Sequence, residues 1–545
     1  MVIPGACSCA LIGCQPGPFD YELRDFPEAK ALGVSESDDV TVDPALRPRV
    51  EDDPDTEAWF DPDAELLSTA EVSIERAVSL ALRNNRGLRV EMLQPMITGT
   101  FEALERARFD PVLDGEVAIL RERSQRISAA TQEIFGTLDE RLQGDVGIQQ
   151  ELPTGTTLDA SFRQVFADSD RTPGQYSTRF GFTLTQALLR GADRDANVAS
   201  IQQARLDTLA SEYELRGFVE SLVADVETTF WEFLLTNREI EIFESSLELA
   251  ERQLNETSQR VEVGVVAETE LAAAKAEIAQ RREELINARS DMKRARLELL
   301  RLMNPRTREG WDLELQLLGE AAAEPIELDP VGEHVRLARF MRPELNEARL
   351  RLEQGRLDVV RTRNGLLPRL DFFITLGKTG FADSFGEAWA DLDGRGYDLQ
   401  AGLAFQYPLG NRAADAEFDR ARFSRRQASE SVENLTQLVD LEVRLAYIEV
   451  NRAEEQIEAT RVTRELREET LRAESEKFRV GTSTTFLVAQ AQRDLLESQI
   501  AEVRAMVNYR QTLIELYRLE GTLLQRRAID APGRRAVERG QTISG

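Results

Sequence analysis

Few side chains in this 545-residue chain could support acid–base, nucleophilic or metal chemistry. There is one histidine, His334, and the three cysteines, Cys7, Cys9 and Cys14, all lie within the first 14 residues. The chain therefore has too few His and Cys residues for a histidine-based proton-transfer site or a zinc site. The sequence also offers no nucleophile–base pair, phosphate-binding glycine loop or cluster of metal-ligand residues. We expect no catalytic residue, no metal and no cofactor, and we predict that the protein is not an enzyme.

The charge of the chain disfavours a second class of function. With 97 acidic and 67 basic side chains the formal net charge is −30, whereas contacts to phosphates need clustered Lys and Arg. Nucleic acid is therefore not an expected partner. No run of about 20 apolar residues occurs, so no membrane-spanning helix is expected either.

Cys14 is the one cysteine whose surroundings suggest a modification. The segment Leu11-Ile12-Gly13-Cys14 resembles the lipobox of bacterial lipoproteins, in which the new amino-terminal cysteine is acylated, and Gln15 resembles the class sorted to the outer membrane. The usual basic start of a signal peptide is missing. We interpret residues 1–14 as signal and lipobox, with a misassigned start or an unstructured tail as alternatives, and the Pro- and Asp-rich residues 15–66 as an extended arm.

Beyond this arm the chain is dominated by long helical patterns. Apolar side chains such as Val223, Val226 and Phe230 recur every three or four residues between charged ones, as in helices that pair through a narrow apolar seam. The expected helices are Val72–Arg108, Ala192–Val261, Val265–Met303, Val331–Asn364, Ala413–Arg479 and Thr484–Arg526. At 1.5 Å per residue the second and fifth would be about 100 Å long. These lengths predict coiled coils, for which an ordinary coiled-coil rod is one alternative.

Two shorter segments alternate instead with a period of two. In Tyr397–Tyr407 the odd positions are apolar or small, and Tyr176–Thr185 shows a similar pattern at its even positions. One apolar and one polar face are typical of strands in a membrane barrel. A half-exposed sheet of a soluble domain produces the same alternation, so the pattern alone leaves both interpretations open.

An internal repeat organises these elements. Ala81–Val117 aligns without gaps on Ala338–Ile374, and Arg260–Gly264 aligns on Lys477–Gly481. The repeated unit is a helix, strands, a long helix, a glycine turn and a second long helix. We place the first repeat at 67–310 with strands at about 110–187, a linker at 311–330, the second repeat at 331–527 with strands at about 368–408, and a disordered tail at 528–545.

The first repeat is longer than the second because of an insertion between Pro111 and Gln186. It contains alternating segments around the turn Pro153-Thr154-Gly155, which predicts an extra hairpin at 142–167. Alternation does not say which strands lie beside this hairpin. We favour a flap or an elongated strand pair over additional wall strands.

The order of these motifs resembles the TolC-type outer-membrane efflux family. The similarity extends over roughly Leu66–Arg526 and is carried by Val72–Asn85 as an opening helix, Thr185–Gly191 and Tyr407–Gly410 as strand-to-helix junctions, and Val263–Ala267 and Val480–Thr484 as periplasmic turns. The resemblance implies a mainly α fold with membrane β. A long antiparallel α-helical coiled-coil barrel would continue into a transmembrane β-barrel shared by a homotrimer, with two tandem repeats per chain. One chain could not close such a barrel, because its edge strands would leave backbone groups unsatisfied in lipid.

The function implied by the resemblance is that of an outer-membrane exit duct of a tripartite efflux system. Its partners would be a periplasmic adaptor (membrane fusion) protein, an inner-membrane pump and outer-membrane lipid. Its location would be the bacterial cell outer membrane, with a long periplasmic extension and a lipid anchor at the N-terminus. A type I protein-secretion channel is an alternative within the family. A non-channel periplasmic coiled-coil adaptor or scaffold is the alternative from another class, and the duplicated proline-strand units oppose it.

The resemblance also places two candidate sites at the helical turns. Acidic residues commonly ring the family's narrow entrance just after the second turn, but the matching positions here are Leu487 and Gln490, which cannot ionise. We predict a gate closed by apolar contact and hydrogen bonding from Phe486, Leu487 and Gln490, with Asp494 and Glu270 as the nearest acids. The predicted adaptor contacts are the turn residues Val263, Gly264, Val265, Val480, Gly481 and Thr482.

Overall fold

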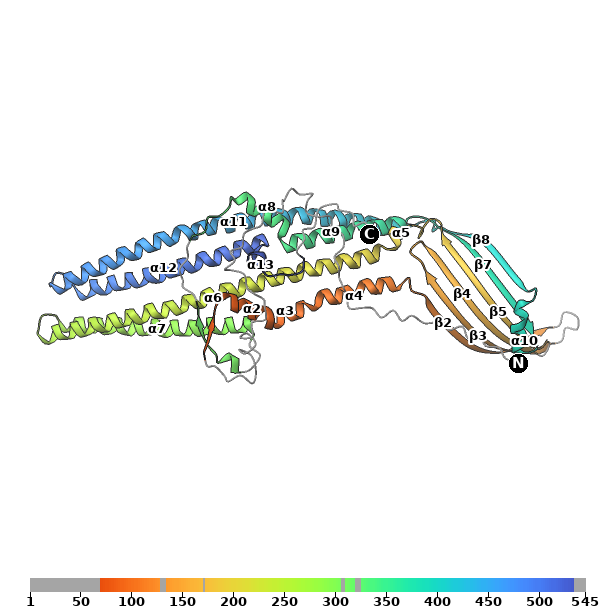
Figure 1. Ribbon diagram of the computed structural model, residues 1–545, viewed down its shortest axis with the longest axis horizontal. Helices are drawn as coiled ribbons and strands as arrows, with labels where there is room; N and C mark the ends of the chain where they lie inside the picture. The colour runs from red at the N-terminus through yellow and green to blue at the C-terminus, as the bar shows by residue number, and fades with distance from the viewer. Residues whose placement is uncertain (1–68, 128–133, 170–171, 305–308, 319–324, 534–545) are drawn as a thin grey trace, which may run out of the picture.

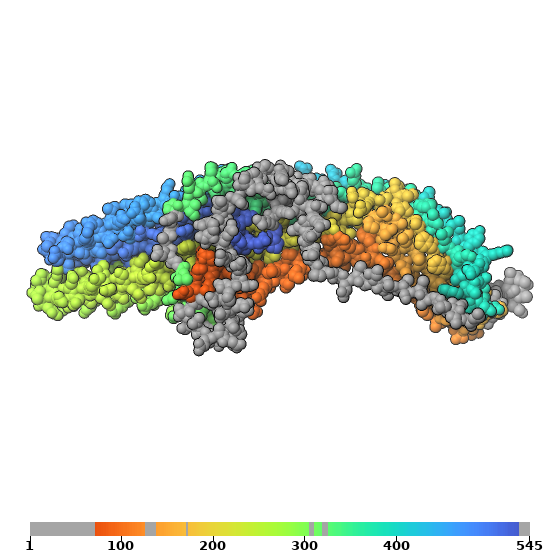
Figure 2. Space-filling model, viewed as in Figure 1, coloured from red at the N-terminus to blue at the C-terminus, as the bar shows by residue number. Residues whose placement is uncertain are grey.

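The computed structural model describes residues 69–127, 134–169, 172–304, 309–318 and 325–533. Cys14, the arm 15–66 and most of the predicted tail lie outside these residues. The described chain is elongated, with helical hairpins at one end and a curved sheet at the other (Figure 1). The space-filling view shows that the body bends where the helices meet the sheet (Figure 2).

Helices make up most of the body. The two longest are α6, Ala199–Glu262, with 64 residues, and α11, Arg412–Arg479, with 68 residues, close to the two longest predicted helices. The others are α2 (Ile74–Asn84), α3 (Arg86–Glu91), α4 (Leu93–Ala107), α5 (Arg194–Asn197), α7 (Glu268–Met303), α8 (Val331–Met341), α9 (Pro343–Gly365), α10 (Phe385–Ala390), α12 (Thr485–Glu520) and α13 (Leu523–Arg526). Within the described residues, no helix has both the length and the apolar character that a membrane crossing requires.

Four helices that the sequence predicts as continuous are interrupted. The segment 192–261 breaks at Val198, which separates α5 from α6. The segment 72–108 breaks at Asn85, whose side chain accepts a hydrogen bond from Leu88 N at 3.0 Å and so caps a new helix. The segment 331–364 breaks before Pro343, because the residue ahead of a proline avoids the helical conformation. The segment 484–526 breaks at Gly521, which has φ +72°.

Six strands form one antiparallel sheet in the order β2-β3-β4-β5-β7-β8. They are β2 (Val112–Ile127), β3 (Ile134–Glu151), β4 (Thr156–Ser169), β5 (Thr172–Ala187), β7 (Arg369–Ala382) and β8 (Tyr397–Gln406). A separate two-stranded parallel sheet joins β1 (Thr69–Val72) to β6 (Glu314–Leu317). The predicted linker 311–330 therefore contains the short strand β6.

The predicted extra hairpin is present as β3 and β4, and both strands lie within the six-stranded sheet. β3 pairs along its length with β2, where Val146 lies opposite Gly115, and β4 pairs with β5, where Phe162 lies opposite Phe180. We favoured a flap or an elongated strand pair. A flap separate from the sheet is wrong, because it would leave long rows of backbone donors and acceptors without ladder partners, whereas the strands of 18 and 14 residues are paired on both sides.

Four helices lie in a row where the body meets the sheet. α4 contacts α6, α6 contacts α9, and α9 contacts α11, and each is directly connected in the chain to one of the strands β2, β5, β7 and β8. Farther from the sheet, α6 pairs with α7 and α11 pairs with α12, forming two helical hairpins (Figure 1).

The largest apolar cluster lies at the middle of the body, where α2, α6, α7 and α13 meet. Phe230, Phe233, Leu299 and Leu523 are almost fully buried there. Ile529 and Ala531 pack against the same cluster. The prediction of a disordered tail from residue 528 is therefore wrong for residues 528–533, because apolar side chains in this stretch cover the core.

A buried ion pair lies beside the end of α12. Glu220 is 2% exposed and accepts a hydrogen bond from Arg216 Nε at 3.2 Å, while Arg216 Nη2 donates to Gly521 O at 3.4 Å. Burial raises the pKa of Glu220 to about 7, and the nearby Arg216 opposes that rise only in part.

This raised pKa predicts a pH dependence of stability. The folded state holds the Glu220 proton more tightly than the unfolded chain, so its contribution to stability is fully present below the ordinary value of 4.5 and is lost as the pH rises through about 7. Between pH 5 and pH 8 the free energy of unfolding should fall by up to about 3 kcal/mol more in the wild type than in Glu220→Gln. Urea unfolding of the detergent-solubilised protein measures both slopes.

The matched control for this experiment is Glu458→Gln. Glu458 is an acid on the surface of α11 whose pKa is lowered by a hydrogen bond from Arg461, so it should leave the slope between pH 5 and pH 8 unchanged. Equal slopes for wild type and Glu220→Gln would show that Glu220 is ionised throughout this range.

Candidate functional site at the helical turns and along the sheet

The two helical turns farthest from the sheet are built in the same way. At the α6–α7 turn, Gly264 N donates to Val261 O and Val265 N to Arg260 O, both at 2.9 Å; the α11–α12 turn has Gly481 N on Phe478 O at 3.1 Å and Thr482 N on Lys477 O at 2.8 Å. Gly264 and Gly481 have φ of +75° and +82°, which glycine adopts without strain. The valines around them are open to solvent, with Val263 and Val265 each 73% exposed and Val480 69% exposed.

The two turns also contact one another. Arg260 Nη1 donates to Phe478 O at 3.0 Å, and the guanidinium of Arg260 lies 4.3 Å from the centroid of the Phe478 ring, a cation–π geometry. The six predicted adaptor-contact residues therefore lie in the turns of two neighbouring helical hairpins, α6–α7 and α11–α12, whose tips form one end of the molecule (Figure 2).

The predicted gate residues only partly come together. Phe486, Leu487 and Gln490 lie on one exposed side of the first turns of α12, where Phe486 is 63% and Leu487 44% exposed. Asp494 continues this side but pairs with Arg467 of α11 at 2.7 Å. Glu270 is half-buried in the first turn of α7, in the other hairpin.

A buried charge cluster between the hairpins was missed by reasoning from sequence. Glu277 of α7 accepts hydrogen bonds from Arg281 Nη2 at 2.5 Å and from Arg493 Nη1 of α12 at 2.7 Å. The side chain of Arg281 is 2% exposed and that of Glu277 is 9% exposed. The repeat alignment places Glu277 at the position of Asp494, and this equivalence of two acids was the signal that could have identified it.

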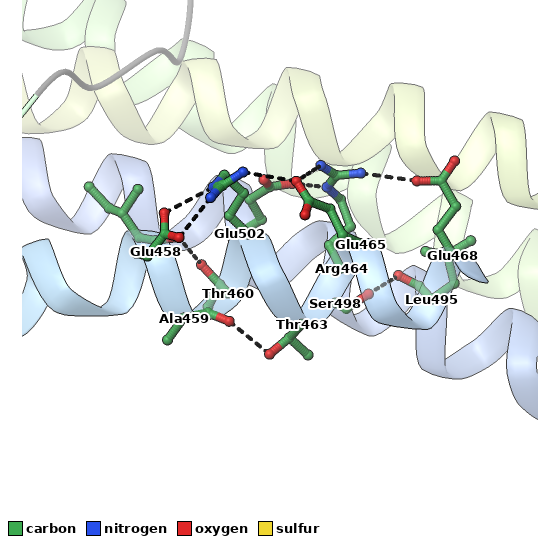
Figure 3. A network of polar contacts seen from close by, with 12 residues as sticks. Glu458, Ala459, Thr460, Thr463, Arg464, Glu465, Glu468, Leu495, Ser498 and Glu502 are labelled. Atoms are coloured by element: carbon green, nitrogen blue, oxygen red, sulfur yellow. Dashed lines mark hydrogen bonds and ion pairs between the residues drawn. The ribbon is translucent and has the colours of Figure 1, made fainter. Parts of the chain in front are cut away.

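Ion pairs also join α11 to α12 near the turn. Arg464 Nε lies 2.6 Å from Glu502 Oε2 on α12, and the same guanidinium contacts Glu465 and Glu468 on its own helix (Figure 3). Arg461 bridges Glu458 and Glu465 one turn away. This part of the hairpin is therefore held by surface charges as well as by a thin apolar seam.

The sheet has one apolar and one polar face across all six strands. Because paired residues share a face, the ladder registers place on one side Leu113, Val117 and Ile119 of β2, Leu142, Val146 and Ile148 of β3, Leu158 and Phe162 of β4, Phe180 and Phe182 of β5, Ile374 and Leu376 of β7, and Leu399, Leu403 and Phe405 of β8. Many of these side chains are exposed. α10 covers part of this face, where Trp389 packs on Phe162. An exposed apolar surface spread over six strands is an interaction surface.

Charged and hydroxyl side chains interact across strands on the opposite face. Arg179 of β5 makes two hydrogen bonds of 2.7 Å to the carboxylate of Asp398 on β8, although β7 lies between these strands. The bridge passes over Gly377, where an added Cβ would lie 2.3 Å from Asp398 Oδ1. Glycine on the intervening strand therefore permits a polar link across three strands.

An elongated helical body joined to a sheet with one apolar and one polar face defines a membrane channel protein of mixed α and β structure. The chain belongs to the outer membrane efflux protein family, whose model matches residues 78–305 and 335–522. It is an outer-membrane efflux duct, and the alternative of a non-channel scaffold is thereby rejected.

Individual proteins similar to this chain come from the same kind of channel. The pyoverdine export outer membrane protein OpmQ of Pseudomonas putida is 23% identical over 448 residues, which cover 75% of this chain and 86% of OpmQ. The solved outer-membrane channel OprN has a TM-score of 0.63 at 19% identity, with 85% of this chain and 91% of OprN covered. The outer membrane channel CmeC of Campylobacter jejuni has a TM-score of 0.60 at 16% identity, with 83% and 86% covered.

The ion pair between Glu277 and Arg493 should stabilise the contact between the two hairpins. In a double-mutant cycle with Glu277→Gln and Arg493→Gln, we expect a coupling free energy of about 1–2 kcal/mol, because the carboxylate is almost fully buried. Hydrogen exchange of the first turns of α12 provides the measurement.

The control cycle for this pair uses Arg289 and Glu244, which join α7 to α6 at 2.8 Å with side chains 55% and 50% exposed. It should yield about 0.5 kcal/mol or less. A coupling no larger in the Glu277–Arg493 cycle than in this control would contradict the assignment.

Proposed function

We propose that the chain is one protomer of a homotrimeric duct whose six-stranded sheets join into one barrel. The observation that carries this proposal is the exposed apolar face of the sheet together with its two open edges. β2 and β8 each have a strand partner on one side only among the described residues. In lipid, unpaired backbone groups cost several kcal/mol each, so these edges need partner strands from neighbouring copies.

The helices beside these edges support the same closure. α4 leads into β2 on one flank, and α11 follows β8 on the other flank. Both helices expose apolar side chains, including Met96, Phe101 and Leu104 on α4 and Phe423 and Leu441 on α11. Each flank of the chain thus ends in a strand with an open edge and a helix with uncovered apolar surface, as a cyclic head-to-tail ring requires.

The cargo and partners belong to the same proposal. The protein would receive small molecules from an inner-membrane pump through a periplasmic adaptor. The similarity to OpmQ, a pyoverdine export protein, supports efflux over type I protein secretion. Acylation of Cys14 would add a lipid anchor to the barrel.

The gate would lie at the helical turns. Phe486, Leu487 and Gln490 from three protomers would close the entrance by apolar contact and hydrogen bonding, and no ring of carboxylates is needed at this level. The pairing of Asp494 with Arg467 supports this view, because it commits the nearest acid on α12 to its own hairpin. Opening would then separate the two hairpins at the Glu277–Arg493 contact.

Removing the apolar seal should open the channel. Leu487→Ser combined with Gln490→Ser should raise the resting conductance in planar bilayers several-fold, because polar side chains of smaller size leave a hydrated gap. Leu466→Ser, an equally drastic change at a 64% exposed position of α11, serves as control and should leave the conductance low.

The same preparations test the assembly. Native mass spectrometry in detergent should give three chains for the wild type and both variants. Unchanged conductance in an intact trimer would refute the gate, and a monomeric mass would refute the duct itself.

The valines at the two turns should contact the adaptor. Val263→Asp with Val480→Asp should weaken adaptor capture at least tenfold, since a charge at a desolvated contact costs more than about 1.4 kcal/mol. Glu262→Gln, adjacent to the same turn but without an apolar side chain to bury, provides the comparison. Pull-down with the cognate adaptor measures both, and equal capture by all three proteins would exclude the turns as the contact.

A further inference from the structure

The hairpin β3–β4 supplies two strands that no helix of the chain requires. The four helices in the row, α4, α6, α9 and α11, are each connected to one strand, β2, β5, β7 or β8, whereas β3 and β4 are connected only to other strands. We propose that this hairpin is a permanent part of the membrane wall and that it widens the exit of the duct from 12 strands to 18, three times the six of one chain. This inference rests on the trimeric duct proposed above.

The faces of the hairpin match those of the wall. Val146 and Ile148 of β3 lie on the same face as Phe182 of β5. The registers carry one row of apolar side chains on this face across all six strands, namely Leu113, Ile148, Ala160, Phe182, Leu376 and Leu399. The opposite face of the hairpin carries charged and amide side chains, namely Gln143, Asp145, Asp159 and Arg163. A flap in water would have no use for a lipid-compatible face, whereas a wall strand needs one.

The turn between β3 and β4 is fixed to both neighbouring strand-to-helix junctions. On one side Gln150 Nε2 donates to Phe109 O at 3.1 Å, just before β2. On the other side Asn197 Nδ2 of α5 donates to Pro153 O at 2.9 Å, and Ala187 N donates to Gly155 O at 2.9 Å. These bonds hold the end of the hairpin at the level where the helices meet the sheet.

The backbone at this turn is also closely packed. A Cβ added to Gly155 would lie only 2.0 Å from Gly191 O, and both glycines have positive φ, +74° and +91°. The hairpin is thus fitted against the start of the helical body, as expected for a strand pair that is part of the wall.

The perimeter of the duct gives the physical reason for two more strands per chain. Twelve helices spaced by about 9 Å form a ring with a perimeter of about 110 Å. With strands about 4.8 Å apart and tilted by about 40°, a 12-stranded wall has a perimeter of about 75 Å and an 18-stranded wall one of about 110 Å. The added hairpins therefore match the girth of the sheet to that of the helical tunnel, and the backbone diameter rises from about 24 Å to about 35 Å. Bulky solutes that fit the tunnel would leave it without meeting a narrower exit.

Single-cysteine variants test whether the hairpin lies in the wall. Ile148→Cys and Gln149→Cys sample the two faces of β3, and Leu399→Cys and Gln400→Cys sample the two faces of β8 in the same two rows of the sheet. Each variant carries Cys7→Ser and Cys9→Ser, and the same background without an added cysteine gives the blank. Spin labels on the trimer in lipid vesicles report accessibility to oxygen, which enriches in lipid, and to a nickel chelate, which stays in water.

We expect the label at 148 to favour oxygen and the label at 149 to favour the nickel chelate, each by several-fold, as the labels at 399 and 400 do. If both labels on β3 are open to water while those at 399 and 400 alternate, the hairpin lies outside the membrane wall and the inference fails, although the duct stands. If 399 and 400 do not alternate either, the proposed membrane barrel itself fails.

A deletion tests the width directly. Removal of residues 134–169 joins β2 to β5 and leaves four strands per chain. Maleimide-polymers of increasing size, added from outside to cells with Thr183→Cys on the polar face of β5, measure the largest molecule that enters. The size limit should fall by about a third in diameter relative to the full chain. An unchanged size limit would refute the widened exit. If the deleted chain does not assemble, the spin-label accessibilities of the single-cysteine variants still decide whether the hairpin lies in the wall.

Discussion

The structure depends on one constraint, which is that a backbone amide or carbonyl in lipid must have a partner within the protein. The six strands satisfy each other across the sheet and leave only the outer sides of β2 and β8 open among the described residues. The side chains of the sheet and the helices next to β2 and β8 fit this constraint. Most apolar side chains of the sheet lie on one face and most polar ones on the other. The flanking helices α4 and α11 carry uncovered apolar residues where a neighbouring copy would meet them in the proposed trimer.

This constraint also explains where the stability of one chain resides. On the sheet, α10 covers only part of the apolar face, where Trp389 packs on Phe162 with ring centroids 5.1 Å apart; in the proposed duct the rest of that face would be covered by lipid. The chain keeps its own core at the middle of the body, where α2 and α13 close over α6 and α7 and residues such as Phe230 and Leu523 are buried. The turn end is different again, because buried and half-buried charges such as Glu277 and Arg493 hold two thin hairpins together. A charged contact of this kind is specific in geometry and can separate without exposing a large apolar surface.

Much of this architecture could be predicted from the sequence, because the spacing of apolar residues and the Gly and Pro residues that end helices and strands are local properties of the chain. The long helices α6 and α11, the glycine turns at 264 and 481 and the alternation in β5 and β8 all follow from residues close together in the chain. The failures concern partners distant in sequence. β1 and β6 have four residues each and pair across more than two hundred others, too short for any periodicity to show. Alternation in β3 and β4 identified their faces but not their neighbours, and Arg493 lies 216 residues from Glu277.

The way in which β3 and β4 are inserted has a consequence for how such channels vary. A single added strand would bring the chain out on the wrong side of the membrane and reverse the helix that follows, so new strands enter in pairs. In the proposed threefold ring each pair would be counted three times, so the circumference could change only in steps of six strands. The width of such a duct would therefore take only certain discrete values. Gain or loss of one hairpin per chain would change the width by one such step, and the contacts of Gly155 and Asn197 would hold the added hairpin in place at its base.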